Sequence, residues 1–244
     1  MSDELLLSAD RDRVRTLTFN RPEAANAFNV ELYQRVTASL EDAAADEQVH
    51  VVVLTGAGRS FCAGTDLVEM AAMVSAIQSG DGRAGAQTGD AYGGFVDAIT
   101  AFAKPLVAAV NGPGIGLGFT MLAHCDLVLM AERSRLKAPF TEMGVAPEVA
   151  SSYLLPRRMG RQAASLALLA STWISAEEAV AAGIALRVCA DVALMEEAQA
   201  LAMDIASKPL PSVMATKALI VAAERDGIAA ARRREDAAFA ELLG

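Results

Sequence analysis

Residues 49–67 read VHVVVLTGAGRSFCAGTDL, in which an apolar, β-branched run passes directly into a glycine-rich segment. Such a run, bounded by glycines, is typical of a buried strand that ends in a tight turn. Residues 106–120, LVAAVNGPGIGLGFT, repeat the same order. In open α/β sheets, ligands bind at the carboxyl ends of the strands. The sequence therefore predicts an α/β fold with a ligand site where these two turns meet.

Neighbouring segments supply further strands and helices for this fold. Residues 14–20 partly alternate and residues 127–130 form a short apolar run, as strands do. From Asn29, which can cap a helix, apolar residues recur at three- to four-residue spacing, and a second helix is expected through Phe95. Residues 79–90, SGDGRAGAQTGD, are rich in glycine and poor in hydrophobic residues, so we expect a mobile surface loop there.

One segment, residues 105–123, is long and uncharged enough to be scored as a membrane span. It contains Asn111, two prolines and four glycines near its middle. Because these residues break a continuous helix, we interpret the segment as a strand, a sharp turn and the start of a helix. The sequence thus favours a protein without a membrane partner.

The pattern changes toward the C-terminus. Residues 175–178, SAEE, form a capping-box signature, Gly183 suits the end of that helix, and from Asp191 onward the pattern is almost wholly helical. We therefore divide the chain into a core at residues 1–190 and a helical region at residues 191–244.

Composition narrows the class of protein further. The 244 residues are 53% hydrophobic, which is enough for one large core, and the formal net charge of -9 argues against binding nucleic acid or an anionic membrane. The 3 cysteines lie in no CxxC arrangement and the 2 histidines have no ligand spacing, so we expect reduced thiols and no metal site. The acidic N-terminus lacks the cationic start of a signal peptide. These features predict a cytoplasmic protein.

The glycine-rich turns could serve chemistry or packing. They match neither GxGxxG, nor the P-loop, nor the GxSxG elbow of hydrolases. Two such turns can instead bring two backbone N–H groups to one point, where they would stabilise an oxyanion. The alternative is that the glycines only permit tight turns and close packing. The spacing alone leaves both interpretations open.

Four segments together resemble the enoyl-CoA hydratase/isomerase family, also called the crotonase family. They are NRPEAANAFN (20–29), VVVLTGAGRSFCAGTDL (51–67), KPLVAAVNGPGIGLG (104–118) and CDLVLMAERSRLKAPF (125–140). The resemblance implies a crotonase-like α/β spiral of ββα units and a C-terminal helical trimerisation region, in a homotrimer or a dimer of trimers. It also implies an acyl-CoA thioester as the substrate, with no NAD, flavin or metal cofactor.

The resemblance also assigns residues to the site. It implies that the N–H groups of Thr65 and Leu117 form an oxyanion hole, with Gly116 as the fallback if the turn shifts by one residue. The positions of the two glutamates used by the family's hydratases hold Thr120 and Phe140 here, so ordinary hydration is not expected. The remaining residues implied to bind the substrate or its CoA moiety are Ala25, Ala27, Ala63, Gly64, Asp66, Leu67, Gly116 and Phe140.

The acid of the site is expected at Glu148. Residues 138–160, APFTEMGVAPEVASSYLLPRRMG, resemble the Δ3,Δ2-enoyl-CoA isomerases that carry a Pro-Glu pair here, although Val149 stands where those enzymes usually have glycine. A plainer interpretation is that Glu148 only complements a helix N-terminus. Other hypotheses are a different crotonase-type reaction (hydration by a nonstandard acid, decarboxylation or thioester hydrolysis) and a non-catalytic acyl-CoA-binding paralogue.

The C-terminal segment raises two further expectations. The resemblance implies another helix, following the one that contains Phe239, that covers the site. The sequence does not include this helix. We therefore expect either a partner subunit to supply the cover or a more open pocket. Residues 232–235, RRRE, are interpreted as a solvated face or a subunit contact, with contact to a ligand phosphate as the alternative.

Overall fold

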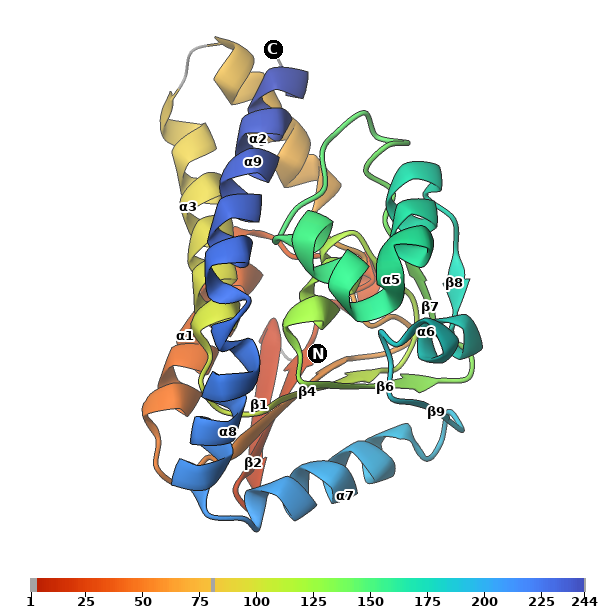
Figure 1. Cartoon of the computed structure of the whole chain (residues 1–244). Coiled ribbons are helices and arrows are strands. Elements are labelled where there is room, and N and C mark those ends of the chain that lie inside the picture. Colours follow the sequence, from red (N-terminus) through yellow and green to blue (C-terminus); the bar gives the residue numbers. More distant parts are fainter. Residues whose placement is uncertain (1–3, 80–81, 244) are drawn as a thin grey trace.

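A six-stranded, mostly parallel sheet forms the centre of the computed structural model, which describes residues 4–79 and 82–243 (Figure 1). Only the first two strands are antiparallel to each other. In spatial order the strands are β1 (Leu6–Arg11), β2 (Val14–Phe19), β3 (Val51–Gly56), β4 (Leu106–Val110), β6 (Leu127–Ala131) and β9 (Arg187–Cys189).

Alternation along the strands sends side chains into two separate cores. Val51 and Val53 of β3 face one core, which also contains the apolar side of α7 (Leu194–Ala206). Val52 and Leu54 face the other and larger core. Because both faces are covered, β3 is buried at every position, which explains why its sequence is a continuous apolar run rather than an alternating one.

Two helices cover the larger core, α1 (Val30–Ala45) and α3 (Gly82–Ala101), which pack against each other. The side chain of Asn29 caps α1 by accepting a hydrogen bond from the N–H of Leu32 at 2.9 Å. Edge-to-face aromatic contacts join α3 to the sheet through Phe28, whose ring centroid lies 5.5 Å from that of Phe95 on α3 and 4.9 Å from that of Phe19 on β2.

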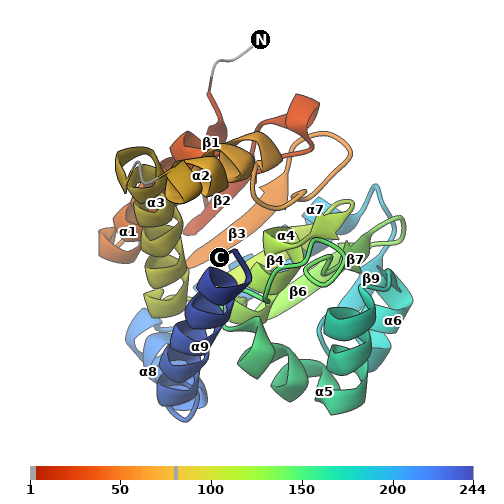
Figure 2. The ribbon, with the colours of Figure 1, turned by 90° about the horizontal axis from the view of Figure 1, so that it is seen from above.

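A second, smaller sheet and further helices complete the fold (Figure 2). A small sheet contains β5 (Gly114–Ile115), β7 (Arg135–Lys137) and β8 (Ile174–Ser175). In both views α9 lies beside α3. The helices not yet given are η1 (Pro22–Ala24), α2 (Leu67–Ser79), α4 (Leu117–Thr120), η2 (Met121–His124), α5 (Ser151–Ala170), α6 (Ala176–Ala182), α8 (Leu210–Ala222) and α9 (Arg225–Leu243).

Most expected elements are confirmed. Residues 105–123 contain β4, β5, α4 and most of η2, as the strand, turn and helix start predict. The capping box at Ser175 and the left-handed Gly183 bound α6. The region after Asp191 consists of α7, α8 and α9. Within the described residues, no helix combines the length and the apolar character that crossing a membrane requires.

The predicted surface loop at residues 79–90 is wrong. Ser79 ends α2, α3 begins at Gly82, and residues 80–81 lie outside the described residues. The low helix propensity of glycine suggested a loop, but α3 continues through Phe95 and Ile99, which are buried in the core. Helices in proteins are stabilised mainly by such packing, which outweighs the propensity of the first turns.

Candidate active site

The two glycine-rich turns are bound directly to each other. The N–H of Ile115 donates to the carbonyl oxygen of Cys62 at 2.9 Å. A Cβ atom at Gly64 would lie 3.0 Å from the carbonyl oxygen of Ile115 and 3.7 Å from the amide nitrogen of Leu117. Gly64 also has a φ of +96°, which disfavours other residues. The glycines therefore permit close packing, and this packing brings the two turns together.

Near this contact, the N–H groups of Thr65 and Leu117 have no backbone acceptor in the described part of the chain. Phe28 binds the carbonyl of Gly64 and the N–H of Asp66, so the intervening N–H of Thr65 faces the other way. Leu117 is the first residue of α4, where helix N–H groups have no intrahelical partner. Gly116, the expected fallback, already donates its N–H to Lys137 at 2.9 Å.

A cavity of about 70 Å³ lies where the turns meet, and Glu148 is in its wall. Glu148 Oε1 is 4.0 Å from the point where a Cβ atom on Gly116 would lie. The hydroxyl groups of Thr65 and Tyr33 are 2.8 Å apart, which anchors the Thr65 side of the cavity. The predicted residues that line the cavity are Ala63, Gly64, Thr65, Leu67, Gly116, Leu117, Phe140 and Glu148.

Ala25, Ala27 and Asp66 are not in the wall of this cavity. The carbonyl oxygen of Ala25 accepts a hydrogen bond from Ala63 at 3.0 Å. Arg21 binds Asp66 at 3.1 Å and also donates to the carbonyl oxygen of Ala27 at 2.5 Å. These three residues thus brace the first glycine-rich turn, and their contact with a CoA moiety stays a prediction.

Val149 also lies outside the cavity, whereas Phe140 and Met143 line it. The side chain of Val149 is buried in the core at 2% exposure, and its φ is +60°. The left-handed conformation turns the chain sharply after Glu148, which directs the two neighbouring side chains to different places. A glycine in place of Val149 would adopt this φ without strain.

The surroundings of Glu148 favour its neutral form. The pKa of its carboxyl group is raised from 4.5 to about 7: burial is the largest cause, the negative charge of Glu235 acts in the same direction, and a hydrogen bond from Tyr92 opposes both. Near neutral pH, both the protonated and the ionised forms are therefore populated. Such a group can accept a proton and return it at the same pH.

Glu235, whose charge acts on Glu148, was not predicted from the sequence as a site residue. The solvated face expected for residues 232–235 is wrong at this position, because Glu235 is 5% exposed. Its carboxylate accepts hydrogen bonds from the N–H groups of Ala150 at 2.7 Å and Ser152 at 2.8 Å. Helical spacing could have revealed it, since the buried Ile228 and Ala231 lie on the same face of α9.

The same face of α9 continues into the cavity wall with Phe239. Helix α9 therefore contributes to the wall, and the expected cover by a partner subunit, or a more open pocket, stays a prediction. Among the residues that the structure describes, no group of three or more His, Cys, Asp or Glu side chains is arranged to hold a metal ion.

Known structures and sequences resemble the chain over nearly its whole length. The structure of an enoyl-CoA hydratase/isomerase from Pseudoalteromonas atlantica T6c matches with a TM-score of 0.88 and 37% identity, covering 99% of this chain and 92% of that one. The 1,2-epoxyphenylacetyl-CoA isomerase of Escherichia coli is 34% identical over 91% of this chain and 83% of its own length. A probable enoyl-CoA hydratase of Rhizobium meliloti is 35% identical over 89% of this chain and 81% of its own.

The enoyl-CoA delta isomerase 2 of Rattus norvegicus is 30% identical over 94% of this chain, which spans 58% of that protein's length. The expected crotonase-like fold is thus confirmed, and it defines an enzyme class that acts on acyl-CoA thioesters. Residues 10–243 match the sequence profile of the enoyl-CoA hydratase/isomerase family. The chain belongs to that family.

Proposed function

We propose that the protein isomerises 3-enoyl-CoA to 2-enoyl-CoA, with Glu148 as the single acid and base. The reaction removes a proton from C2 of the acyl group and delivers a proton to C4. A carboxyl group with a pKa of about 7 suits both steps, because near neutral pH its ionised form can accept a proton and its protonated form can donate one.

The N–H groups of Thr65 and Leu117 supply the electrostatic part of this reaction. When C2 loses its proton, negative charge develops on the thioester oxygen and spreads over the dienolate. Two unpaired donors at the meeting point of the turns can bind that oxygen, and one such donor contributes about 3 kcal/mol to the transition state in other enzymes. The dienolate then takes the proton back at C4 from Glu148.

One observation carries the proposal. Glu148 is an acid beside the two unpaired N–H groups, whereas the positions of the hydratase glutamates hold the buried Thr120 and Phe140. The site thus has an acid for proton transfer, but the two positions at which hydratases carry the glutamates that activate water hold no acid. The resemblance to enoyl-CoA delta isomerase 2 of Rattus norvegicus agrees with this assignment, although other relatives are named as enoyl-CoA hydratases.

The test is an activity assay with purified protein and 3-enoyl-CoA. We expect Glu148→Gln to lower kcat by about 10² to 10⁴, as the loss of a general acid and base does. Glu142→Gln is the matched control, because Glu142 lies on the same segment but is exposed and paired with Lys137 at 2.8 Å. Full activity in Glu148→Gln, or rapid addition of water to 2-enoyl-CoA by the wild type, would refute the proposal.

A further inference from the structure

The backbone directly after Glu148 is strained. Val149 and Ala150 both have left-handed φ values, 60° and 56°, and neither is glycine. Residues with side chains pay an energetic cost in this region, and two in succession persist only when their surroundings hold them in place. The structure therefore requires contacts that fix this peptide.

Two side chains hold the peptide between Val149 and Ala150 from opposite ends. His124 Nε2 lies 2.9 Å from the carbonyl oxygen of Val149, and Glu235 accepts the N–H of Ala150 at 2.7 Å. The second oxygen of Glu235 binds the N–H of Ser152 at 2.8 Å, at the start of α5. Every polar atom of this peptide is thus engaged by a side chain from η2 or α9.

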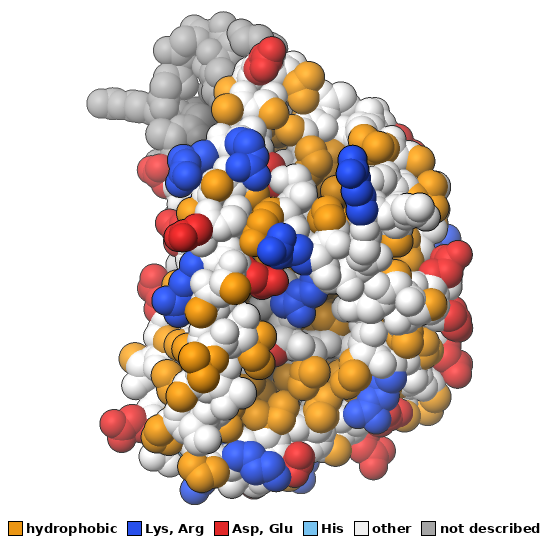
Figure 3. All heavy atoms as spheres, viewed as in Figure 1, with side chains coloured by type: hydrophobic (Ala, Val, Ile, Leu, Met, Phe, Trp, Pro, Cys, Tyr) orange, Lys and Arg blue, Asp and Glu red, His pale blue; other side chains and the backbone are white. Residues whose placement is uncertain are grey.

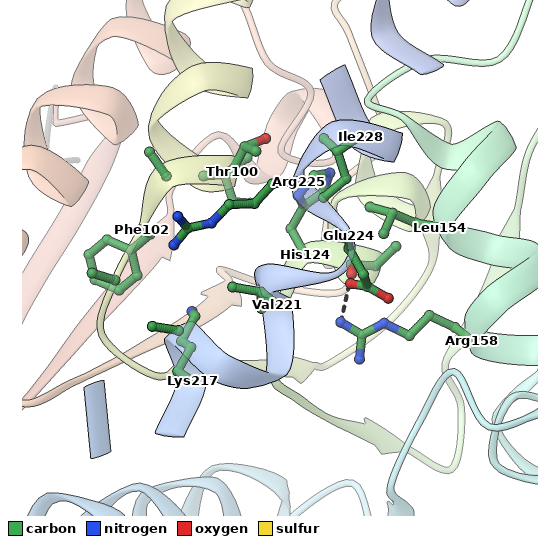
Figure 4. A pocket seen from close by; sticks show the side chains of 15 residues that line it. Thr100, Phe102, His124, Leu154, Arg158, Lys217, Val221, Glu224, Arg225 and Ile228 are labelled. Carbon is green, nitrogen blue, oxygen red and sulfur yellow. Dashed lines mark hydrogen bonds between the residues drawn. The ribbon is translucent and has the colours of Figure 1, made fainter. Parts of the chain in front are cut away.

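The protonation state of His124 is consistent with this role. Burial lowers its pKa to about 4, so the ring is neutral near pH 7. A carbonyl oxygen only accepts hydrogen bonds, and Nε2 must therefore carry the proton. His124 also lies in the wall of a cavity of about 430 Å³, together with Leu154, Arg158 and Lys217 (Figure 4).

We propose that Glu235 is a positioning residue for Glu148: by accepting hydrogen bonds from the N–H groups of Ala150 and Ser152, it clamps the strained Val149–Ala150 peptide and fixes the aim of the Glu148 carboxyl group. The negative charge of Glu235 also favours the protonated form of Glu148. The effect on turnover rests on the proposed isomerase function. The effect on the protonation of Glu148 does not, since it is a property of the folded chain.

The charge of Glu235 is the largest cause of the raised Glu148 pKa after burial. Burial also raises the pKa of Glu235, and its bonds to Ser152 and Ala150 oppose this. The other titratable groups that interact with the two acids are Tyr33 on α1, Cys62 in the first glycine-rich turn, Tyr92 on α3 and Asp236 on α9. The charged groups that act on His124 are Arg158 on α5, Lys217 on α8 and Arg232 on α9.

Two substitutions of Glu235 separate its effect on the position of the Glu148 carboxyl group from its effect on the pKa of that group. Glu235→Asp keeps the negative charge but is one methylene shorter, so it cannot reach both N–H groups. Glu235→Gln keeps the length and one accepting oxygen but removes the charge. Asp236→Asn is the matched control, because it removes a charge from the neighbouring, exposed position of α9.

The first readout is the titration of the Glu148 carboxyl group, followed by NMR in protein labelled with carbon-13 at the glutamate carboxyl and assigned with Glu148→Gln. We expect Glu235→Gln to lower the pKa of Glu148 by about one unit, as the loss of a close like charge does. Glu235→Asp and Asp236→Asn should leave this pKa near its wild-type value. A residue that served only to cap α5 would lower the melting temperature in these variants without moving the titration.

The second readout is the pH dependence of isomerisation. Glu235→Asp should lower kcat about tenfold or more with little change in KM, because misplacing a catalytic group by about 1 Å costs up to 10² in rate. Glu235→Gln should move the acidic limb of the profile to lower pH. Equal titration of Glu148 in all variants, or full kcat in Glu235→Asp, would overturn the proposal. If the wild type does not isomerise 3-enoyl-CoA, the proposed function fails, and the titration of Glu148 alone then tests whether Glu235 acts on this carboxyl group.

Discussion

The ionised form of Glu148 lowers the free energy of unfolding of the protein. Its pKa is about 7 in the folded protein against an ordinary value of 4.5, so the folded state binds this proton more tightly than the unfolded chain does. The contribution of Glu148 to the free energy of unfolding therefore declines as the pH rises from about 4.5 to about 7.

Replacing Glu148 should accordingly stabilise the protein at high pH. At pH 8 we expect Glu148→Gln to raise the free energy of unfolding by up to about 3 kcal/mol, because it removes a buried negative charge. At pH 4, where the carboxyl group is protonated, the two proteins should be nearly equal. Thermal unfolding at both pH values measures this difference, and a variant that is less stable than wild type at pH 8 would show that Glu148 is not held in an unfavourable ionised state.

The same pKa predicts how activity depends on pH. The ionised carboxylate removes the proton from C2, so kcat/KM for 3-enoyl-CoA should fall as the pH drops below about 7. The acidic limb of this profile reports the pKa of the essential base in the free enzyme. A limb near pH 4.5 would mean that the carboxyl group of Glu148 is not desolvated when the substrate arrives.

At the scale of elements, the contact between the two glycine-rich turns determines the site. Gly64→Ala would place a Cβ atom 3.0 Å from the carbonyl oxygen of Ile115 at a φ of +96°, so the turns must separate. We expect a loss of about 1 to 3 kcal/mol in stability and a lower kcat, since the N–H groups of Thr65 and Leu117 would no longer converge.

Gly93→Ala is a matched control for this substitution. Gly93 lies inside α3, and a Cβ atom there would meet nothing within 4 Å. We expect this change to stabilise the protein by about 0.5 to 1 kcal/mol, because alanine is the better helix former, and to leave kcat unchanged. Equal kcat values in both variants would show that the approach of the turns is not needed for catalysis.

Prediction from sequence worked best where local pattern and tertiary structure agree. The run at Val51 and the cap at Asn29 identify their elements because buried strands and helix starts have strong local signals. The start of α3 at Gly82 was missed, since glycine-rich helices depend on distant packing. Glu235 was missed for a similar reason: its partners, Ala150 and Ser152, lie far away in the chain.

At the scale of the whole molecule, α8 presents a hydrophobic surface to solvent. Leu219 and Ile220 are 79% and 71% exposed, and hydrophobic side chains gather over the α8 region of the face in Figure 3. Exposed patches of this kind mark contacts between proteins. The assignment of oligomerisation to residues 191–244 stays a prediction, and this surface is the place to test it.

We expect a homotrimer in solution and a smaller species when Leu219 and Ile220 are both replaced by Asp. The two charges would be buried without partners in an interface, which is costly. Light scattering after size-exclusion chromatography measures the mass of both proteins. Replacing Val192, which is 96% exposed but lies between β9 and α7, with Asp is the control and should leave the mass unchanged. A trimer that survives the double substitution would place the interface elsewhere.

The most direct test of the central claim, that one carboxyl group moves the proton, is isomerisation of 3-enoyl-CoA that carries deuterium at C2. Glu148 is the acid in a cavity of about 70 Å³, which holds few waters to exchange the proton. We predict that wild-type protein transfers part of the deuterium to C4 of the 2-enoyl-CoA product and that Glu148→Gln forms no such product. A product whose C4 takes hydrogen only from solvent, at an undiminished rate in Glu148→Gln, would contradict this mechanism.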